Sequence, residues 1–156
     1  MNPDRNNTDE STLPLSLGAL LGRVGRLISN QLTDDFERAG YSITVEQFAL
    51  LVHLWQQDGI TQQELGQRVA KHKTSINSLI NNLEKRNLVK RIEDPTDRRI
   101  NQIRLTRQAW SLQQPLTAIA WATTKHTVQG IDEQELAICR KVLLQLVSNL
   151  NRPSDL

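Results

Sequence analysis

A run of small hydrogen-bonding side chains follows one face of an expected helix in the middle of the chain. Between residues 73 and 86 the apolar residues recur at intervals of three and four, which predicts an amphipathic helix. The face opposite this apolar stripe carries Thr74, Ser75, Asn77, Ser78, Asn81 and Asn82. Such residues are poor helix formers, and a merely solvated face usually carries Glu, Lys and Gln instead. Their hydrogen-bonding groups fit base edges and sugar-phosphate oxygens in a major groove; the alternative is an inert polar face.

Basic side chains flank this helix at both ends, where they can meet backbone phosphates. They are Lys71, His72 and Lys73 at its start and Lys85 and Arg86 at its end. Further along, a turn-rich loop carries Arg98 and Arg99 between strand-like runs at 88–93 and 100–105, which predicts a hairpin with a basic tip. Long cations at such a tip can enter a minor groove. Asp97 beside them either holds a guanidinium in one rotamer or simply forms the turn.

Positive charge is concentrated around the helix and the hairpin. Residues 60–107 contain eleven Lys or Arg and five Asp or Glu, whereas the rest of the chain has more acids than bases. A basic middle on a differently charged scaffold is typical of a nucleic-acid-binding face.

The elements that position these residues follow from periodicity and helix-start signals. We expect helices at 15–39, from Thr44 to about residue 58, and from Thr61 to about residue 70. The short helix after Thr61 and the helix at 73–86 form a helix-turn-helix. We expect a further helix from Thr106 to about residue 127, kinked by a proline at 115, and a last helix that begins at Asp132.

The last helix carries an apolar seam that needs a partner. Its apolar residues step alternately by three and four, as in a heptad repeat, namely Leu136, Cys139, Leu143, Leu146 and Leu150. On such a seam the thiol of Cys139 is interpreted as buried and unreactive.

Other classes of protein find little support in the sequence. The three histidines lie far apart, and no catalytic spacing, phosphate-binding loop or metal-ligand pattern is present, so we expect no enzyme, cofactor or metal. No apolar run is long enough for a membrane span, and no signal peptide is recognised, which favours a cytoplasmic protein, nucleoid-associated when bound to DNA. Residues 1–14 are expected to be a disordered tail.

Three stretches together resemble the MarR (multiple-antibiotic-resistance regulator) family. Residues 97–106, Asp-Arg-Arg-Ile-Asn-Gln-Ile-Arg-Leu-Thr, are similar to its Asp-x-Arg wing and the following strand. Residues 61–65 and 83–89 resemble its helix-turn-helix, with Asn87 where glycine is commoner, and residues 130–136 resemble the lead-in to its last helix. The resemblance covers roughly residues 15–150 and places Thr74, Ser75, Asn77 and Ser78 in the base-facing stretch, and Asp97 and Arg99 in the wing.

The resemblance implies a mainly α fold with a small β-hairpin wing, a winged helix-turn-helix dimer. It divides the chain into a tail (1–14), a dimerisation helix (15–43), a DNA-binding lobe (44–106) and C-terminal dimerisation helices (107–156). The implied dimer interface contains Leu17, Leu20, Leu136, Leu143, Leu146 and Leu150. Family members bind a palindromic operator in double-stranded DNA, usually repress, and often release DNA when a small effector binds.

The implied effector pocket contains Arg23, His53, Trp55 and Trp110, although a tryptophan at helical spacing is more often a core residue. The sequence departs from the family at Ser78 and Asn82, where basic residues are frequent, and at Trp110, where the residue is usually small. A winged-helix protein-interaction module and a ligand-independent DNA-binding factor stay open as alternatives. So does a metal- or haem-sensing variant with His53 as a ligand.

Overall fold

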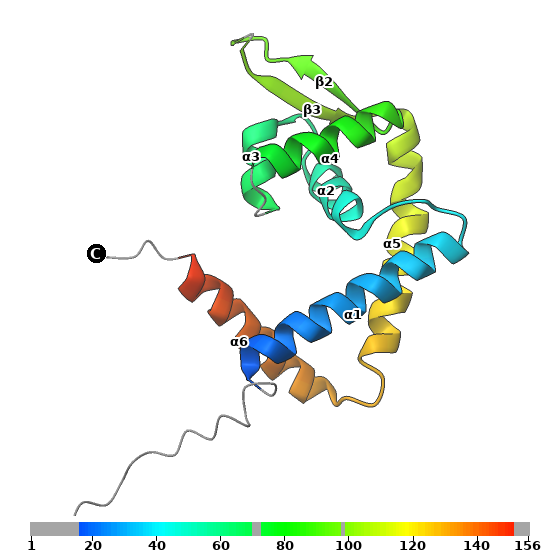
Figure 1. Cartoon of the computed structure of the whole chain (residues 1–156), viewed down its shortest axis with the longest axis vertical. Coiled ribbons are helices and arrows are strands. Elements are labelled where there is room, and N and C mark those ends of the chain that lie inside the picture. The colour runs from blue at the N-terminus through cyan, green and yellow to red at the C-terminus, as the bar shows by residue number, and fades with distance from the viewer. Residues whose placement is uncertain (1–15, 70–72, 98, 152–156) are drawn as a thin grey trace, which may run out of the picture. The chain divides into compact units, whose positions relative to one another are not determined.

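The computed structural model describes residues 16–69, 73–97 and 99–151 (Figure 1). Lys73 and Thr74 are described by their backbone only. The predicted N-terminal tail therefore lies outside the described residues. The elements run in the order α1 (Leu17–Arg38), α2 (Val45–Gln56), β1 (Ile60–Thr61), α3 (Gln62–Arg68), α4 (Lys73–Lys85), β2 (Val89–Glu93), β3 (Asn101–Leu105), α5 (Arg107–Thr127) and α6 (Glu133–Leu150). The chain is thus mainly α-helical with a small sheet, as predicted.

Helix starts are set by local side-chain contacts. Thr44 caps α2: its hydroxyl accepts from the Gln47 N–H, and the Gln47 side chain accepts from the Thr44 N–H, which completes a capping box. The hydroxyl of Thr61 accepts from the Glu64 N–H at 3.1 Å and so caps α3. Asp132 forms a second capping box at the start of α6. All three predicted starts are confirmed.

The sheet contains one strand more than the predicted hairpin. β2 and β3 pair in antiparallel register from Val89 opposite Leu105 to Glu93 opposite Asn101, and they form the wing. The two-residue β1 pairs with the other edge of β3, with Ile60 opposite Ile103, so that the strand order is β1-β3-β2. β1 joins α2 to α3 and ties the wing to the helix-turn-helix.

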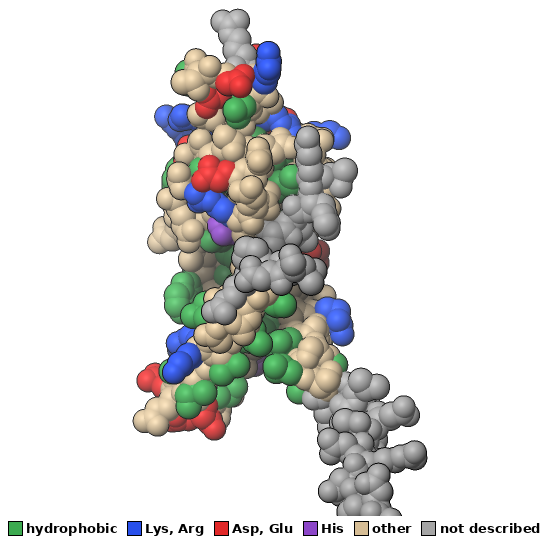
Figure 2. Space-filling model, turned by 90° about the vertical axis from the view of Figure 1, so that its left-hand side faces the viewer, with side chains coloured by type: hydrophobic (Ala, Val, Ile, Leu, Met, Phe, Trp, Pro, Cys, Tyr) green, Lys and Arg blue, Asp and Glu red, His purple; other side chains and the backbone are tan. Residues whose placement is uncertain are grey.

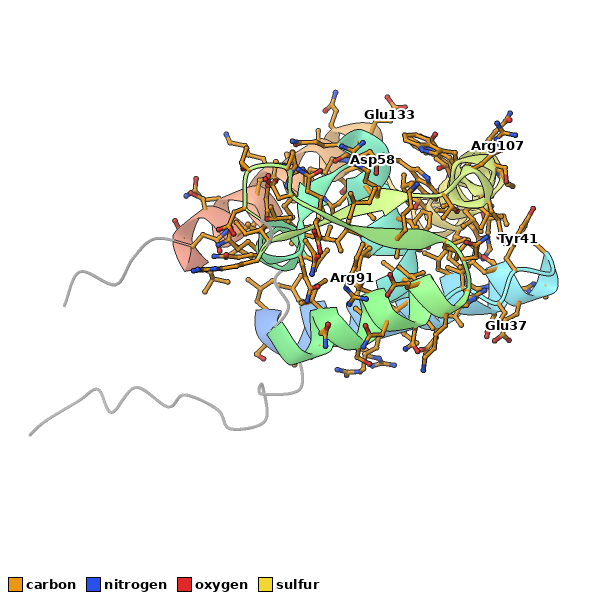
Figure 3. All side chains as sticks on the ribbon, turned by 90° about the horizontal axis from the view of Figure 1, so that it is seen from above. Glu37, Tyr41, Asp58, Arg91, Arg107 and Glu133 are labelled. Atoms are coloured by element: carbon orange, nitrogen blue, oxygen red, sulfur yellow. The ribbon has the colours of Figure 1, made fainter. Side chains whose placement is uncertain are left out.

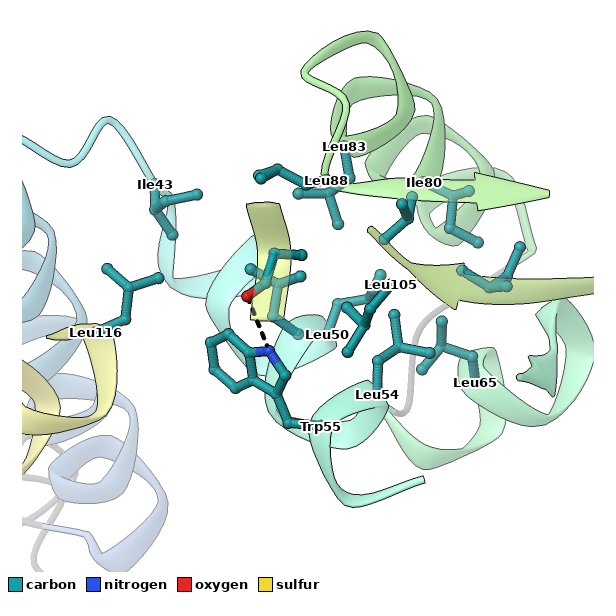
Figure 4. Packing of buried hydrophobic residues seen from close by; sticks show 14 of the residues in the cluster. Ile43, Leu50, Leu54, Trp55, Leu65, Ile80, Leu83, Leu88, Leu105 and Leu116 are labelled. Atoms are coloured by element: carbon teal, nitrogen blue, oxygen red, sulfur yellow. Dashed lines mark hydrogen bonds between the residues drawn. The ribbon is translucent and has the colours of Figure 1, made fainter. Parts of the chain in front are cut away.

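One buried cluster holds these elements together (Figure 4). α2 contributes Leu50, Leu51 and Leu54, and the cluster also includes residues of α1, α3, α4 and all three strands. Two residues of α5, Ala109 and Leu116, belong to the same cluster. The beginning of α5 therefore packs with the lobe predicted at 44–106.

Trp55 connects α2 to α5 from within this core. It is 9% exposed, and its indole N–H donates to the carbonyl of Ala109 at 3.1 Å, the dashed line in Figure 4. α5 continues as a helix through Pro115, so the predicted helix is confirmed and the proline does not end it.

The chain divides between Thr123 and Thr124 into two compact units. In the first unit, the C-terminal half of α1 is anchored by Leu32 and Phe36, whereas its N-terminal half exposes Leu17, Leu20, Leu21, Val24 and Leu27. In the second unit, none of the residues of α6 is buried. Figure 2 shows hydrophobic side chains open to solvent on part of the surface. Among the described residues, no helix has the length and apolar character that a membrane span needs.

Candidate nucleic-acid interface

The polar face of α4 is exposed because the opposite face is fixed in the core. Ile76, Ile80 and Leu83 are at most 2% exposed and hold the helix against α2, α3 and the wing. The side chains on the other side are open to solvent: Ser75, Asn77, Ser78, Asn81 and Asn82. The structure therefore brings these predicted site residues together on one accessible face.

Only some of the predicted phosphate-contacting residues lie in the described part of the chain. Lys71 and His72 lie outside the described residues, and Lys73 and Thr74 are described only as backbone of the first turn of α4. Lys85 and Arg86 are exposed at the other end of α4. Arg86 also has a structural contact, because its guanidinium donates to Gln47 Oε1 at 3.0 Å and so ties the end of α4 to the capping box of α2.

Arg91, which the sequence reasoning missed, lies across the wing-side edge of α4 (Figure 3). Its Nη2 donates to Asn77 Oδ1 at 3.1 Å and to Asn81 Oδ1 at 2.7 Å. Its Nη1 pairs with the carboxylate of Glu84, and its Nε donates to Gln62 Oε1 at 3.5 Å. One guanidinium therefore joins β2, α3 and three successive turns of α4.

A signal for Arg91 was present in the strand pattern. Side chains alternate along a strand, so Arg91 lies on the same face as the buried Val89. A strand arginine on the inner face needs a polar partner there, and Glu84 on α4 supplies it.

The turn between α4 and the wing explains why Asn87 stands in a position where the resemblance favours glycine. Asn87 has φ 56°, in the left-handed region that only glycine and, less readily, asparagine or aspartate adopt without much strain. The N–H of Asn87 bonds to the carbonyl of Glu84, and the N–H of Leu88 bonds to that of Leu83, which closes α4.

The base of the wing is fixed to α5 by Thr106. Its backbone N–H donates to the Leu88 carbonyl, and its hydroxyl donates to the Asn87 carbonyl at 2.7 Å. The same hydroxyl accepts from the Ala109 N–H at 3.2 Å and caps α5, as predicted. Thr106, the last residue of the wing motif, therefore has a structural role.

Two carboxylates shape the tip of the wing. Asp94 accepts hydrogen bonds from the side chain and backbone N–H of Thr96 and from the Gln102 side chain, and these lower the pKa of Asp94 from 3.8 to about 2. Asp97 Oδ1 accepts from the backbone N–H of Arg99 at 2.9 Å, which is the contact of a turn former. The alternative, in which Asp97 fixes a guanidinium, has no support among the described residues. The side chain of Arg99 is exposed, and Arg98 lies outside the described residues.

The predicted effector-pocket residues lie on three different helices. Arg23 is exposed on α1, His53 is half-buried on α2, and Trp55 is a core residue. Trp110 is 42% exposed and lines a shallow hollow along α5 together with Gln113, Gln114, Thr117, Ala118 and Trp121. That hollow shares only Trp110 with the predicted pocket.

The predicted dimer-interface leucines are accessible in the single chain. Leu17, Leu20, Leu143 and Leu150 are between 37% and 84% exposed, and Leu136 and Leu146 are half-buried. Cys139, interpreted above as buried, is exposed in the single chain.

Known proteins that this chain resembles are transcriptional regulators. The model of the MarR family matches residues 43–100. The HTH-type transcriptional regulator YsmB of Bacillus subtilis (strain 168) is 27% identical over 136 residues, which are 87% of each chain.

Solved structures extend the likeness to most of the chain. The transcriptional regulator PA3341 is 34% identical, with a TM-score of 0.75 over 88% of this chain and 100% of that one. BpsR of Bordetella bronchiseptica, whose DNA binding is regulated by 6-hydroxynicotinic acid, has a TM-score of 0.78 over 94% of this chain and 98% of its own. At 20% identity, the match to BpsR shows a shared fold.

Proposed function

Since this chain belongs to the MarR family of DNA-binding transcriptional regulators, we propose that it represses transcription from a palindromic operator, which it binds as a homodimer. It acts by binding and not by catalysis, in the cytoplasm where the DNA lies. A small effector releases the operator.

The observation that carries this proposal is the exposed Ser and Asn face of α4 beside a basic wing. In this proposal α4 enters a major groove, and its exposed side chains, with Lys73 and Thr74, meet base edges. Arg98 and Arg99 at the wing tip enter the adjacent minor groove. Lys71, His72, Lys85 and Arg86 contact phosphates and fix the register.

Apolar side chains that are exposed to solvent in the single chain support the proposed homodimer. Leu17 is 56% exposed on α1 and Leu150 is 84% exposed on α6. Large apolar surfaces of this kind mark interfaces. A two-fold dimer presents two copies of α4, which is why its operator is expected to be palindromic.

The effector is proposed from a protein of the same fold. BpsR responds to 6-hydroxynicotinic acid, a small aromatic acid. Here the indole of Trp110 is 42% exposed and offers an aromatic surface in the hollow along α5. An aromatic acid is therefore the first effector class to test.

The test is fluorescence anisotropy with a labelled duplex from the region upstream of the protein's own gene. A scrambled duplex of the same composition is the control, and each is titrated at two salt concentrations. Selective binding that weakens steeply with salt supports the proposal, because displaced counterions are the signature of phosphate contacts. Equal affinity for both duplexes contradicts a sequence-specific repressor, and absence of binding favours a protein-interaction module. Adding 6-hydroxynicotinic acid to the bound complex then tests the release step.

A further inference from the structure

We propose that Arg91 and Gln62 make Asn77 a pure hydrogen-bond donor toward DNA, so that it selects guanine at the base pair it faces. An unconstrained asparagine prefers adenine, because its oxygen and nitrogen together pair with the N6 and N7 edge. The inference rests on the proposed function, namely that α4 lies in a major groove. Arg91 and Gln62 act here as positioning residues that do not themselves touch the base.

Arg91 sets the orientation of the Asn77 and Asn81 amides. Arginine carries only hydrogen-bond donors, so the atom of Asn77 or Asn81 that faces Arg91 must be the oxygen. Arg91 Nη2 lies 3.1 Å from Asn77 Oδ1 and 2.7 Å from Asn81 Oδ1. Both amides therefore turn their oxygen toward the wing and their nitrogen away from Arg91.

Both lone pairs of the Asn77 amide oxygen are occupied. An amide oxygen has two lone pairs. At Asn77 one accepts from Arg91 and the other from Gln62 Nε2 at 3.3 Å. Within the described part of the chain, the Asn77 amide nitrogen has no acceptor. Asn77 thus offers two free N–H groups and no free acceptor.

Asn81, one turn further along α4, differs in one respect. Its oxygen accepts only from Arg91 among the described residues, so one lone pair stays available. Asn81 can still pair with adenine, and it is an internal comparison for Asn77 on the same helix.

The network holds this arrangement in place. The Arg91 side chain is 20% exposed, and it is paired with the Glu84 carboxylate and bonded to Gln62. Gln62, the second donor to Asn77, is the first residue of α3. Because Thr61 caps the start of this helix, the backbone of Gln62 is held in place. Because the Asn77 amide is already held in one orientation, binding to a base costs it little conformational entropy.

The two free N–H groups of Asn77 match the major-groove edge of guanine better than that of the other bases. In the major groove guanine presents two adjacent acceptors, N7 and O6, which suit two N–H donors. Adenine presents one acceptor beside the N6 donor, and cytosine presents a donor. Loss of a good bidentate match of this kind weakens binding about tenfold.

The experiment is selection from a randomised duplex library, followed by competition between duplexes that differ at single base pairs. The wild-type protein is expected to require guanine at one position of each half-site. Arg91→Met and Gln62→Met free the Asn77 oxygen and are expected to reduce the guanine-over-adenine ratio there about tenfold. Asn77→Asp keeps acceptors for Arg91 and Gln62 but presents an acceptor to DNA, so the preference should change to cytosine.

Arg104→Met is the matched control. It removes the same charge from the neighbouring strand β3, where the guanidinium lies beside Gly59 and donates to Gln102 Oε1; among the described side chains it has no hydrogen bond to α4. We expect it to weaken binding to all duplexes alike and to leave every base ratio unchanged. Ratios between duplexes also cancel any general loss of affinity or of folded protein.

The outcomes separate this inference from the proposed function. If the wild-type protein enriches no sequence, the proposed function and this inference both fail. If it enriches a sequence but the base ratios of Arg91→Met and Asn77→Asp equal those of wild type, this inference alone is wrong. Thermal unfolding of each variant confirms that the compared proteins are folded, and Asn77→Asp alters only an exposed side chain.

Discussion

Replacing Thr106 by Val should destabilise the protein measurably, because one hydroxyl joins the wing to α5. The hydroxyl donates to the Asn87 carbonyl at 2.7 Å and accepts from the Ala109 N–H at 3.2 Å. Valine has nearly the same shape, so the change removes these bonds without creating a cavity.

The magnitude follows from the two contacts. Loss of an N-terminal helix cap reduces stability by about 1 kcal/mol. Loss of the bond to the Asn87 carbonyl removes about 1 kcal/mol more. A total of about 2 kcal/mol corresponds to a decrease in Tm of about 4–8 °C for a chain of this size.

The assay is thermal unfolding followed by circular dichroism at one fixed protein concentration, because dimerisation makes Tm depend on concentration. Thr33→Val is the matched control. The Thr33 hydroxyl donates only to the Ser29 carbonyl one turn earlier in α1, at 2.9 Å, so its loss should change stability by less than about 0.5 kcal/mol. Equal shifts in Tm for the two variants would refute the structural role assigned to Thr106.

Three further predictions concern the wing and the proposed interface. Arg99→Ala should weaken binding to operator DNA and reduce its salt dependence, by about 0.9 in slope for each phosphate charge that the guanidinium neutralises from the minor groove. Anisotropy at several salt concentrations, with Lys125→Ala as control, measures this. An unchanged affinity and slope would show that the wing tip does not contact DNA. Leu143→Asp should shift the protein toward monomer in light scattering, and an unchanged mass would exclude that residue from the interface. Asp94 stabilises the fold above its unfolded pKa of 3.8, and this contribution is lost as the pH falls toward about 2. Asp94→Asn should therefore be less stable than wild type at neutral pH in urea unfolding. The difference should shrink between pH 3.8 and about 2, and a pH-independent difference would contradict the cause assigned to this pKa.

Features that depend on nearby residues were predictable from the sequence. The caps at Thr44, Thr61 and Asp132 each join a side chain to a backbone group two or three residues away, so their spacing alone locates the helix starts. The buried stripe of α4 follows in the same way from a period that the sequence displays.

Features that depend on contacts between residues far apart in the sequence were not predictable from the sequence. β1 has only two residues and exists through pairing with Ile103, more than forty positions away, so no local pattern indicates it. Arg91 contacts Asn77 and Gln62 only after the wing has folded against α4. Helical spacing favours a core position for Trp55, but its hydrogen-bond partner, the carbonyl of Ala109 in α5, is 54 residues away and cannot be predicted from α2 alone.

The exposed apolar residues of α6 link the folding of this helix to assembly of the proposed dimer. An isolated helix of its length is only marginally stable in water, and helices in proteins are stabilised mainly by packing an apolar face. Yet no residue of α6 is buried in the single chain, and Leu144 and Val147 are more than half exposed. The proposed dimer would provide the missing burial, so α6 should gain most of its stability when two chains associate. Dissociation should then unfold α6 and at the same time remove the second copy of α4 that a palindromic operator requires. A substitution on this helix far from DNA is therefore expected to reduce operator affinity in proportion to its effect on the dimer.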